Sequence, residues 1–209
     1  MKNFDDILLD TFGRGVPILA DEITAAFPKL TRVAVYQNIE KSVSRGFLAR
    51  AERGVYYIPN KGRFGNVPLS SDSVLERKYV ANGTSIFGYY SGLCLENREG
   101  LSEQVPAVLE ITTNASSKRV RSLGSYAGWK DVVIRKPRCE VTSQNVDVLK
   151  FLDAITNVSI TELDTSSFKN LKRLAKRAGQ KNAYAFAAYY PAKTSKKLIE
   201  GQALGVFAI

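Results

Sequence analysis

The stretch of residues 31–46 constrains the fold of this chain more than any other part of the sequence. Its bulky apolar side chains recur at intervals of about four residues, so they fall within about one third of a helix surface. These side chains are Val35, Tyr36, Ile39 and Val43. The opposite side carries Ala34, Gln37 and Lys41. Thr31 is a suitable N-cap and Gly46 a suitable stop, so we expect an amphipathic helix over residues 31–45.

The segments on either side of this helix complete a recognisable order of elements. Apolar residues recur at helical spacing in residues 4–12, and a second short helix is expected over residues 20–27, with residues 16–19 as a connection. After Gly46, two β-rich stretches at 47–50 and 55–58 flank a turn that contains Gly54. The order helix, helix, helix, hairpin is typical of a winged helix-turn-helix.

The rest of the chain predicts a second domain, so the expected fold class is α+β. Residues 60–68 are rich in Gly, Asn and Pro and mark the expected boundary. We therefore expect a winged helix-turn-helix over residues 1–65 and a mixed α/β domain over residues 66–209. Within the second domain, helices are expected at 70–81, 146–154, 166–179 and 195–200, and strands at 108–113 and 131–136. Residues 84–95 fit either a helix or a strand.

The winged helix-turn-helix predicts a contact with duplex DNA, because a helix fits the major groove and its N-terminal side chains reach base edges. The residues expected at that contact are Lys29, Thr31, Arg32, Ala34, Gln37, Lys41, Arg50 and Arg53. Gln37 can pair with adenine, Arg32 with guanine or a phosphate, and Ala34 can touch a thymine methyl. The arginines of the hairpin would lie on phosphates or in the minor groove. The alternative is a winged helix that contacts only proteins, with its charges simply solvated.

The residue types that are missing exclude several kinds of chemistry. The chain has no histidine, which removes the Ser-His and Cys-His nucleophile pairs and imidazole metal ligands. Cys94 and Cys139 are too far apart in sequence for a CxxC zinc or redox motif. We therefore expect no cofactor and no metal. No apolar run is long enough to span a bilayer and no secretory signal is present, so we expect a cytoplasmic protein without a membrane partner.

An enzyme remains a weaker alternative. The second domain contains carboxylates that Mg²⁺ chemistry uses, namely Glu110, Asp131, Glu140 and Asp147. No two of them are spaced to fix one metal from one element, and the chain has no P-loop. The expectation is therefore a protein without catalytic activity. Another alternative is a regulator whose second domain senses a small ligand through its tyrosines at 89–90 and 184–190.

The order of these features resembles that of the AbiE-type antitoxins of type IV, abortive-infection toxin–antitoxin systems. The hairpin sequence Arg53-Gly54-Val55-Tyr56-Tyr57-Ile58-Pro59 is similar to the G-x-Y-x-x-P wing of that family. Gly92-Leu93-Cys94-Leu95 and Ser102-Glu103-Gln104-Val105-Pro106, followed by Ile111-Thr112-Thr113, are similar to its G-L-T-x-Q-V-P signature, interrupted here at residues 96–101. The resemblance covers about residues 5–155. From the residues alone, the Gln104-Val105-Pro106 phrase is interpreted as a loop that enters a core strand through proline.

The resemblance implies a transcriptional repressor that is also an antitoxin in phage defence. The winged helix would bind inverted repeats in its own promoter, with one protomer at each half-site. The C-terminal domain would counteract a nucleotidyltransferase-like toxin without forming a stable complex with it. An operator with two half-sites also follows from size, because one winged helix covers too little DNA for useful specificity.

The C-terminal quarter of the chain adds a second candidate surface. The net charge of the protein is +10, and residues 158–209 hold nine Lys and Arg against three Asp and Glu. A basic excess of this kind favours a polyanionic partner. The spacing of three and four residues predicts a row of cations on one helix face, made of Lys169, Lys172, Arg173, Lys176, Arg177 and Lys181. It would touch operator DNA or the RNA target of the toxin; the alternative is a solvated face.

Overall fold

The chain divides between Lys78 and Tyr79 into two units, each built from helices and strands, so the protein belongs to the α+β class. The computed structural model describes residues 2–63, 65–126 and 128–208. The division lies beyond the boundary expected at residue 65. Helix α4 (Ser71–Tyr79) therefore belongs almost entirely to the first unit. Two ion pairs near its C-terminal end hold it to earlier parts of that unit: Arg77 with Glu22 at 3.0 Å and Lys78 with Glu52 at 2.5 Å. Phe64, within the segment expected to form the boundary, is not among the described residues.

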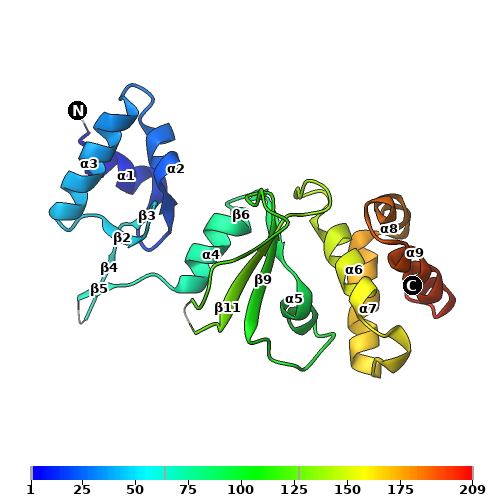
Figure 1. Ribbon diagram of the computed structural model, residues 1–209. Coiled ribbons are helices and arrows are strands. Elements are labelled where there is room, and N and C mark those ends of the chain that lie inside the picture. Colours follow the sequence, from blue (N-terminus) through cyan, green and yellow to red (C-terminus); the bar gives the residue numbers. More distant parts are fainter. Residues whose placement is uncertain (1, 64, 127, 209) are drawn as a thin grey trace. The chain divides into compact units, whose positions relative to one another are not determined.

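The helices of the first unit begin and end where the sequence supplies caps. These elements are α1 (Phe4–Phe12), β1 (Ile18–Leu19), α2 (Ala20–Ala26), α3 (Arg32–Ser44), β2 (Ala49–Glu52), β3 (Val55–Tyr57), β4 (Asn60–Gly62) and β5 (Gly65–Val67) (Figure 1). The Asn3 side chain accepts a hydrogen bond from the Asp6 N–H at 2.8 Å, and Thr31 accepts one from the Ala34 N–H at 3.3 Å. Gly46, at φ 74°, supplies the left-handed backbone that follows α3. The three expected helices and the β2–β3 hairpin are thus confirmed.

The core of the first unit lies between α1, α2, α3 and an antiparallel sheet with the strand order β1-β3-β2. Val35 and Ile39 of α3 are fully buried, as expected, but Val43 is only half-buried. Ser42 is also fully buried, and its hydroxyl donates to the Asp5 carboxylate of α1 at 2.7 Å. Tyr36 and Val43 pack half-buried against the same core, so the expected apolar stripe is present. The Ser42–Asp5 hydrogen bond adds a polar contact between α1 and α3.

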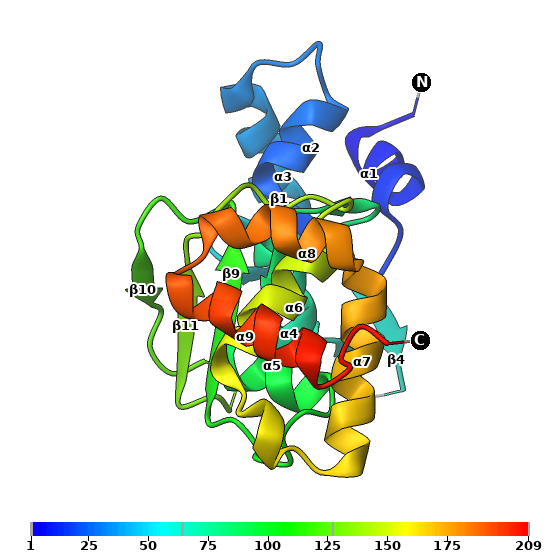
Figure 2. The same cartoon turned by 90° about the vertical axis from the view of Figure 1, so that its right-hand side faces the viewer.

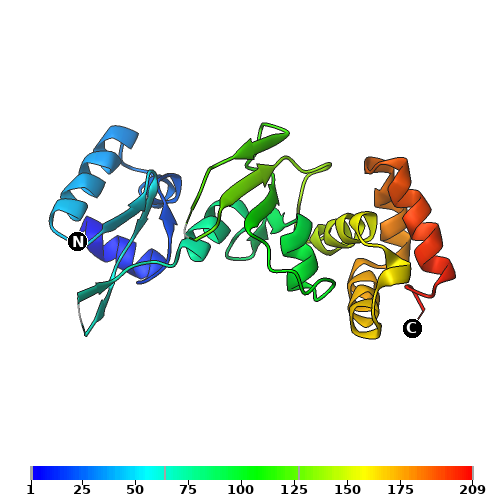
Figure 3. The same cartoon turned by 60° about the horizontal axis from the view of Figure 1, so that its bottom comes forward.

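Two connecting parts of the first unit contain strands. The connection before α2 forms β1, in which Ile18 pairs with Tyr56 and Leu19 with Val55 of β3. The segment expected as a boundary loop contains a second hairpin, in which β4 and β5 pair antiparallel. The residues of this hairpin are exposed on both strands, and it projects from the helices of the first unit (Figure 3).

The second unit is a mixed sheet followed by a group of helices. Its strands are β6 (Ala81–Asn82), β7 (Ser85–Ile86), β8 (Gly88–Tyr90), β9 (Val108–Thr113), β10 (Val120–Ser122) and β11 (Asp131–Arg135). Its helices are α5 (Gly92–Arg98), α6 (Val146–Asn157), α7 (Thr165–Ala178), α8 (Gln180–Phe186) and α9 (Ala192–Ala203), with 3-10 turns at Ile160–Glu162 and Ala187–Tyr189. The sheet has the strand order β10-β11-β9-β8, in which β9 and β11 are parallel and the outer pairs antiparallel.

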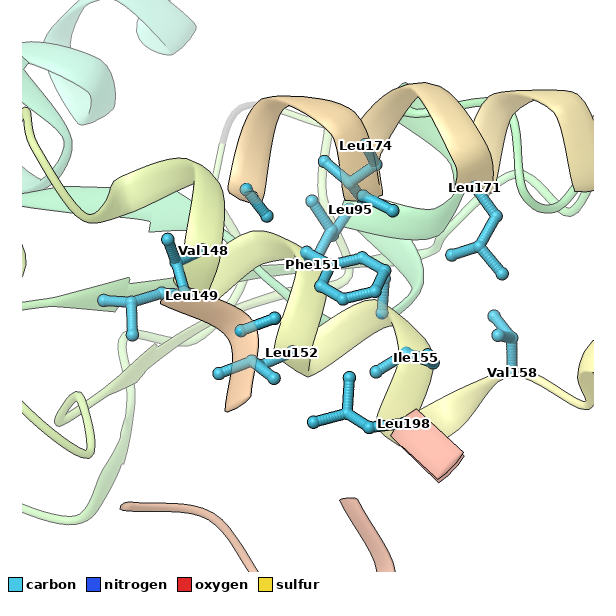
Figure 4. Packing of buried hydrophobic residues seen from close by; sticks show 14 of the residues in the cluster. Leu95, Val148, Leu149, Phe151, Leu152, Ile155, Val158, Leu171, Leu174 and Leu198 are labelled. Atoms are coloured by element: carbon cyan, nitrogen blue, oxygen red, sulfur yellow. The ribbon is translucent and has the colours of Figure 1, made fainter. Parts of the chain in front are cut away.

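Helix α6 is the centre of the second core, because eight of its twelve residues are buried, and its polar residues share one side. It packs against α5, α7, α8 and α9 (Figure 2). Phe151 and Ile155 lie among side chains of the neighbouring helices, which include Leu95, Leu171 and Leu198 (Figure 4). The wide apolar face of α6 is thus covered by the four neighbouring helices.

The sequence predictions for the second unit hold for the longer elements. The helices expected near 70–81, 146–154, 166–179 and 195–200 and the strands expected at 108–113 and 131–136 are all present. Residues 84–95, which fitted either structure, contain β7, β8 and the start of α5. The phrase ending in Pro106 is a loop that leads into β9, as expected, and Val105 in it is 87% exposed. Strand β10 and helix α8 were not predicted.

Candidate nucleic-acid interface

The outer side of α3 carries the expected base-contacting residues in an accessible position. Gln37 and Lys41 are exposed, and Ala34 is half-buried. They lie opposite the buried pair Val35 and Ile39, because residues three and four apart share one side of a helix. The outer side of α3 thus carries exposed polar side chains.

The N-terminal end of α3 is held by its cap and by an ion pair. Thr31 is the N-cap, and Lys29 lies exposed in the turn between α2 and α3. The Arg32 guanidinium is 3.2 Å from the Asp21 carboxylate of α2 and 5.7 Å from the centre of the Tyr36 ring. Both partners of the ion pair are well exposed, so this bond is weak and an external anion can replace it.

Two residues on the outer side of α3 were missed by the sequence reasoning. Val33 is 68% exposed, and Glu40 is also exposed. Together with Arg32, Tyr36, Gln37 and Lys41 they line a shallow depression along the helix. Their spacing would have identified them, since residues 33, 37, 40 and 44 recur at the same helical interval as the buried stripe but on the other side.

The β2–β3 hairpin presents its two arginines differently. Arg50 is on β2 and donates a hydrogen bond to the Tyr56 hydroxyl at 3.2 Å, with its guanidinium 5.5 Å from the centre of the ring. Arg53 is exposed at the turn, where Gly54 has φ 78°. Arg50 is therefore oriented by an aromatic ring, whereas Arg53 extends into solvent at the tip of the hairpin.

The β4–β5 hairpin adds cations that the sequence reasoning assigned to a linker. Lys61 and Arg63 are exposed on this projecting hairpin. A run of glycines and asparagines predicts a loop, so the sequence contains no clear signal for this hairpin. Such a protrusion is suited to contact a phosphate backbone.

The row of cations expected in the C-terminal helices is divided by the structure. Lys169, Lys172, Arg173 and Lys176 share one face of α7, with Lys172 half-buried. Lys181 is not part of that row, because Gly179 at φ 75° ends α7 and Lys181 belongs to α8. Arg177 is also set apart, because it pairs with Glu99 at 2.7 Å and with Asp147 at 3.5 Å. The expected single stripe of six was wrong in these two members.

A second concentration of positive charge, around the ends of β10 and β11, was not predicted at all. Arg119, Arg135, Lys136 and Arg138 line one cavity of the second unit. Three of them lie within four consecutive residues, which was the available signal, but the sequence reasoning used that stretch only to predict a strand. The carboxylates Glu110 and Asp153 line the same cavity.

The described residues give no sign of a metal centre or a membrane span. No group of three or more Cys, Asp and Glu side chains in the described ranges could hold a metal ion. Within the same ranges, no helix combines the length and apolar character needed to cross a bilayer. Cys94 is buried and Cys139 half-buried, and both are free thiols. No known protein-family model matches the chain, and no curated protein is similar enough to count as a match.

Proposed function

We propose that the first unit is a winged helix-turn-helix that binds duplex DNA, with α3 in the major groove and the β2–β3 hairpin as the wing. The observation that carries the proposal is the outer side of α3, where Gln37 and Lys41 are exposed. The N-terminus of this helix is capped by Thr31. A helix presented in this way has the dimensions of the B-DNA major groove. The alternative, a winged helix that contacts only proteins, gives no specific role to the exposed cations on the two hairpins.

The side chains on α3 suggest a division of roles. Gln37 is exposed and suits adenine, and Glu40 can accept a hydrogen bond from the amino group of cytosine. Val33 and Ala34 can touch a thymine methyl. Arg53, Lys61 and Arg63 are exposed on the two hairpins and suit phosphates, so they would contribute affinity without sequence preference.

The biological role that we propose is that of a transcriptional autorepressor and antitoxin. The support is the resemblance to the AbiE-type antitoxins described above. In this role the protein binds inverted repeats in its own promoter, one protomer at each half-site. The second unit counteracts a nucleotidyltransferase-like toxin without a stable complex, and the basic face of α7 contributes contacts to DNA or RNA. The assignment involves no catalysis by this chain.

A footprint on the region upstream of the gene tests the proposal. We expect protection of two half-sites whose centres are about 10 base pairs, or a multiple of that, apart. A growth-rescue assay tests the antitoxin role separately: the protein is co-expressed with a nucleotidyltransferase-like toxin, and the growth of the cells is measured. A uniform, sequence-independent footprint at all concentrations would contradict the repressor role.

A further inference from the structure

The cavity at the ends of β9 and β11 in the second unit is not used by the proposed function. It has a volume of about 400 Å³, within the usual range for small-molecule pockets. Residues from β8, β9, β10, β11 and α6 line it, and its surface is chiefly polar. Glu110 and Thr112 come from β9 and Arg135 from β11, and these parallel strands end at the same edge of the sheet. In open sheets this edge is where ligands commonly bind.

The charges of the cavity do not balance. Four cations face two carboxylates, and one of the cations is engaged: Arg135 Nε donates to Glu110 Oε2 at 2.6 Å. Arg119, Lys136 and Arg138 form no ion pair with any described residue. Arg138 lies 4.9 Å from the centre of the Tyr190 ring, which orients its guanidinium. Like charges held together repel, so an anion with two or more charges would stabilise the site.

The floor of the cavity is built from buried polar groups with fixed partners. The Tyr89 hydroxyl donates to Asp153 Oδ2 at 2.7 Å, and the Thr112 hydroxyl donates to Ser91 Oγ at 2.9 Å. Tyr89, Ser91 and Thr112 are all buried. Gly92 has φ 59°, and a Cβ atom there would be 2.6 Å from the Glu110 carboxylate. The glycine therefore permits Glu110 to stay beside Arg135, so the polar groups are arranged before any ligand arrives.

We propose that this cavity binds a small phosphorylated molecule, such as a nucleotide, through Arg119, Lys136 and Arg138. Guanidinium groups pair with phosphate through two parallel hydrogen bonds, which favours phosphate over a less charged anion. The volume accommodates a ligand of that size. The site is separate from α3, so its test does not depend on DNA binding.

Calorimetric titration of the full-length protein with ADP, inorganic phosphate and citrate tests the proposal. We expect ADP to bind, and to bind more tightly than either phosphate or citrate. Arg119→Gln and Arg138→Gln should each weaken ADP binding by about tenfold or more, because each removes a charge-assisted hydrogen bond. Lys130→Gln, at the opposite end of β11 and outside the cavity, removes the same charge and should leave the affinity unchanged.

A steric variant keeps the test independent of charge. Val120 lines the cavity and is 49% exposed, so Val120→Trp should block the site without disturbing the core. We expect it to abolish ADP binding while the melting temperature stays that of the wild type. Three results would overturn the proposal: no binding of ADP, equal affinity for citrate and ADP, or much tighter binding of a 5′-phosphorylated oligonucleotide than of ADP.

Discussion

Asp153 is a carboxyl whose ionised form is disfavoured by burial. Burial raises the pKa of its carboxyl, although the Tyr89 hydroxyl and the arginines at 138 and 135 favour the ionised form. A carboxyl whose pKa is raised by folding stabilises the native state at low pH, and this contribution is lost as the pH rises through the folded value. The ionised form of Asp153 is therefore less favourable in the folded protein than in the unfolded chain.

Asp153→Asn should consequently raise the melting temperature at pH 7, because the amide keeps an oxygen for the Tyr89 hydrogen bond and carries no charge. The difference between variant and wild type should shrink as the pH falls towards the ordinary pKa of aspartate. Thermal unfolding of both proteins between pH 4 and pH 8, a range set by the direction of the shift and by the ordinary value of about 3.9, measures it. A variant that is less stable by the same margin at every pH would contradict this account.

Gly92 offers a second test at the scale of one residue. Gly92→Ala should destabilise the second unit through both the left-handed backbone and the approach to Glu110. Gly83→Ala is the matched control, because Gly83 has φ 58° and nothing within 4 Å of its Cβ position. The backbone cost of about 1–2 kcal/mol should be common to both variants. We expect urea unfolding to give a larger loss for Gly92→Ala; equal losses would mean that Glu110 moves away freely.

At the scale of an element, α3 depends on its cap. Thr31→Ala should cost about 1 kcal/mol in the free energy of unfolding, because the Ala34 N–H loses its acceptor. Thr31→Ser keeps the acceptor and should be close to wild type. The same pair should differ in DNA affinity, since the first turn of α3 holds Arg32 in place. If Thr31→Ala and Thr31→Ser are equally stable by urea titration, the cap is not what begins this helix.

Helix α7 carries one arginine that pairs with other elements, Arg177, and one that bonds within the helix, Arg173. Arg177→Gln should lower the melting temperature, because it releases Glu99 and Asp147 from their shared partner. Arg173→Gln should have a smaller effect, since its guanidinium bonds only to Asn170 of the same helix at 2.8 Å. Both side chains are partly in solvent, so we predict the order of the two effects from calorimetric melting. The reverse order would contradict the assignment of Arg177 as a tether between helices.

Elements with strong local signals could be predicted, whereas elements with weak local signals, such as β1, β10 and α8, could not. Helix α3 follows from its cap, its stripe and its stop, all within sixteen residues. Strand β1 exists only because β3 pairs with it, and β10 is exposed throughout and has no alternating pattern. The same reason separates the two sites. The outer side of α3 can be predicted, because its residues recur every three or four positions in one segment of the sequence. The cavity could not be predicted in this way, because it brings together Tyr89, Glu110, Arg138 and Asp153 from separate parts of the chain.

At the scale of the whole molecule, the net charge of +10 is shared between both units. If α7 contributes to DNA binding, reversing Lys169, Lys172 and Lys176 to Glu should weaken the full-length complex. It should also flatten the dependence of affinity on salt, because fewer counterions are released. We expect both effects with an unchanged far-UV circular dichroism spectrum. Unchanged affinity and slope would show that this face is simply solvated.

The central claim is that α3 of the first unit reads DNA sequence, and a binding titration over a set of altered promoter sites tests it most directly. Gln37→Ala should lose about 1–3 kcal/mol of discrimination at one base pair in each half-site, while its affinity for unrelated DNA stays the same. Gln144→Ala, an exposed glutamine in the second unit, is the control and should behave as wild type. If Gln37→Ala prefers the same bases by the same margin as the wild-type protein, α3 is not the reading helix.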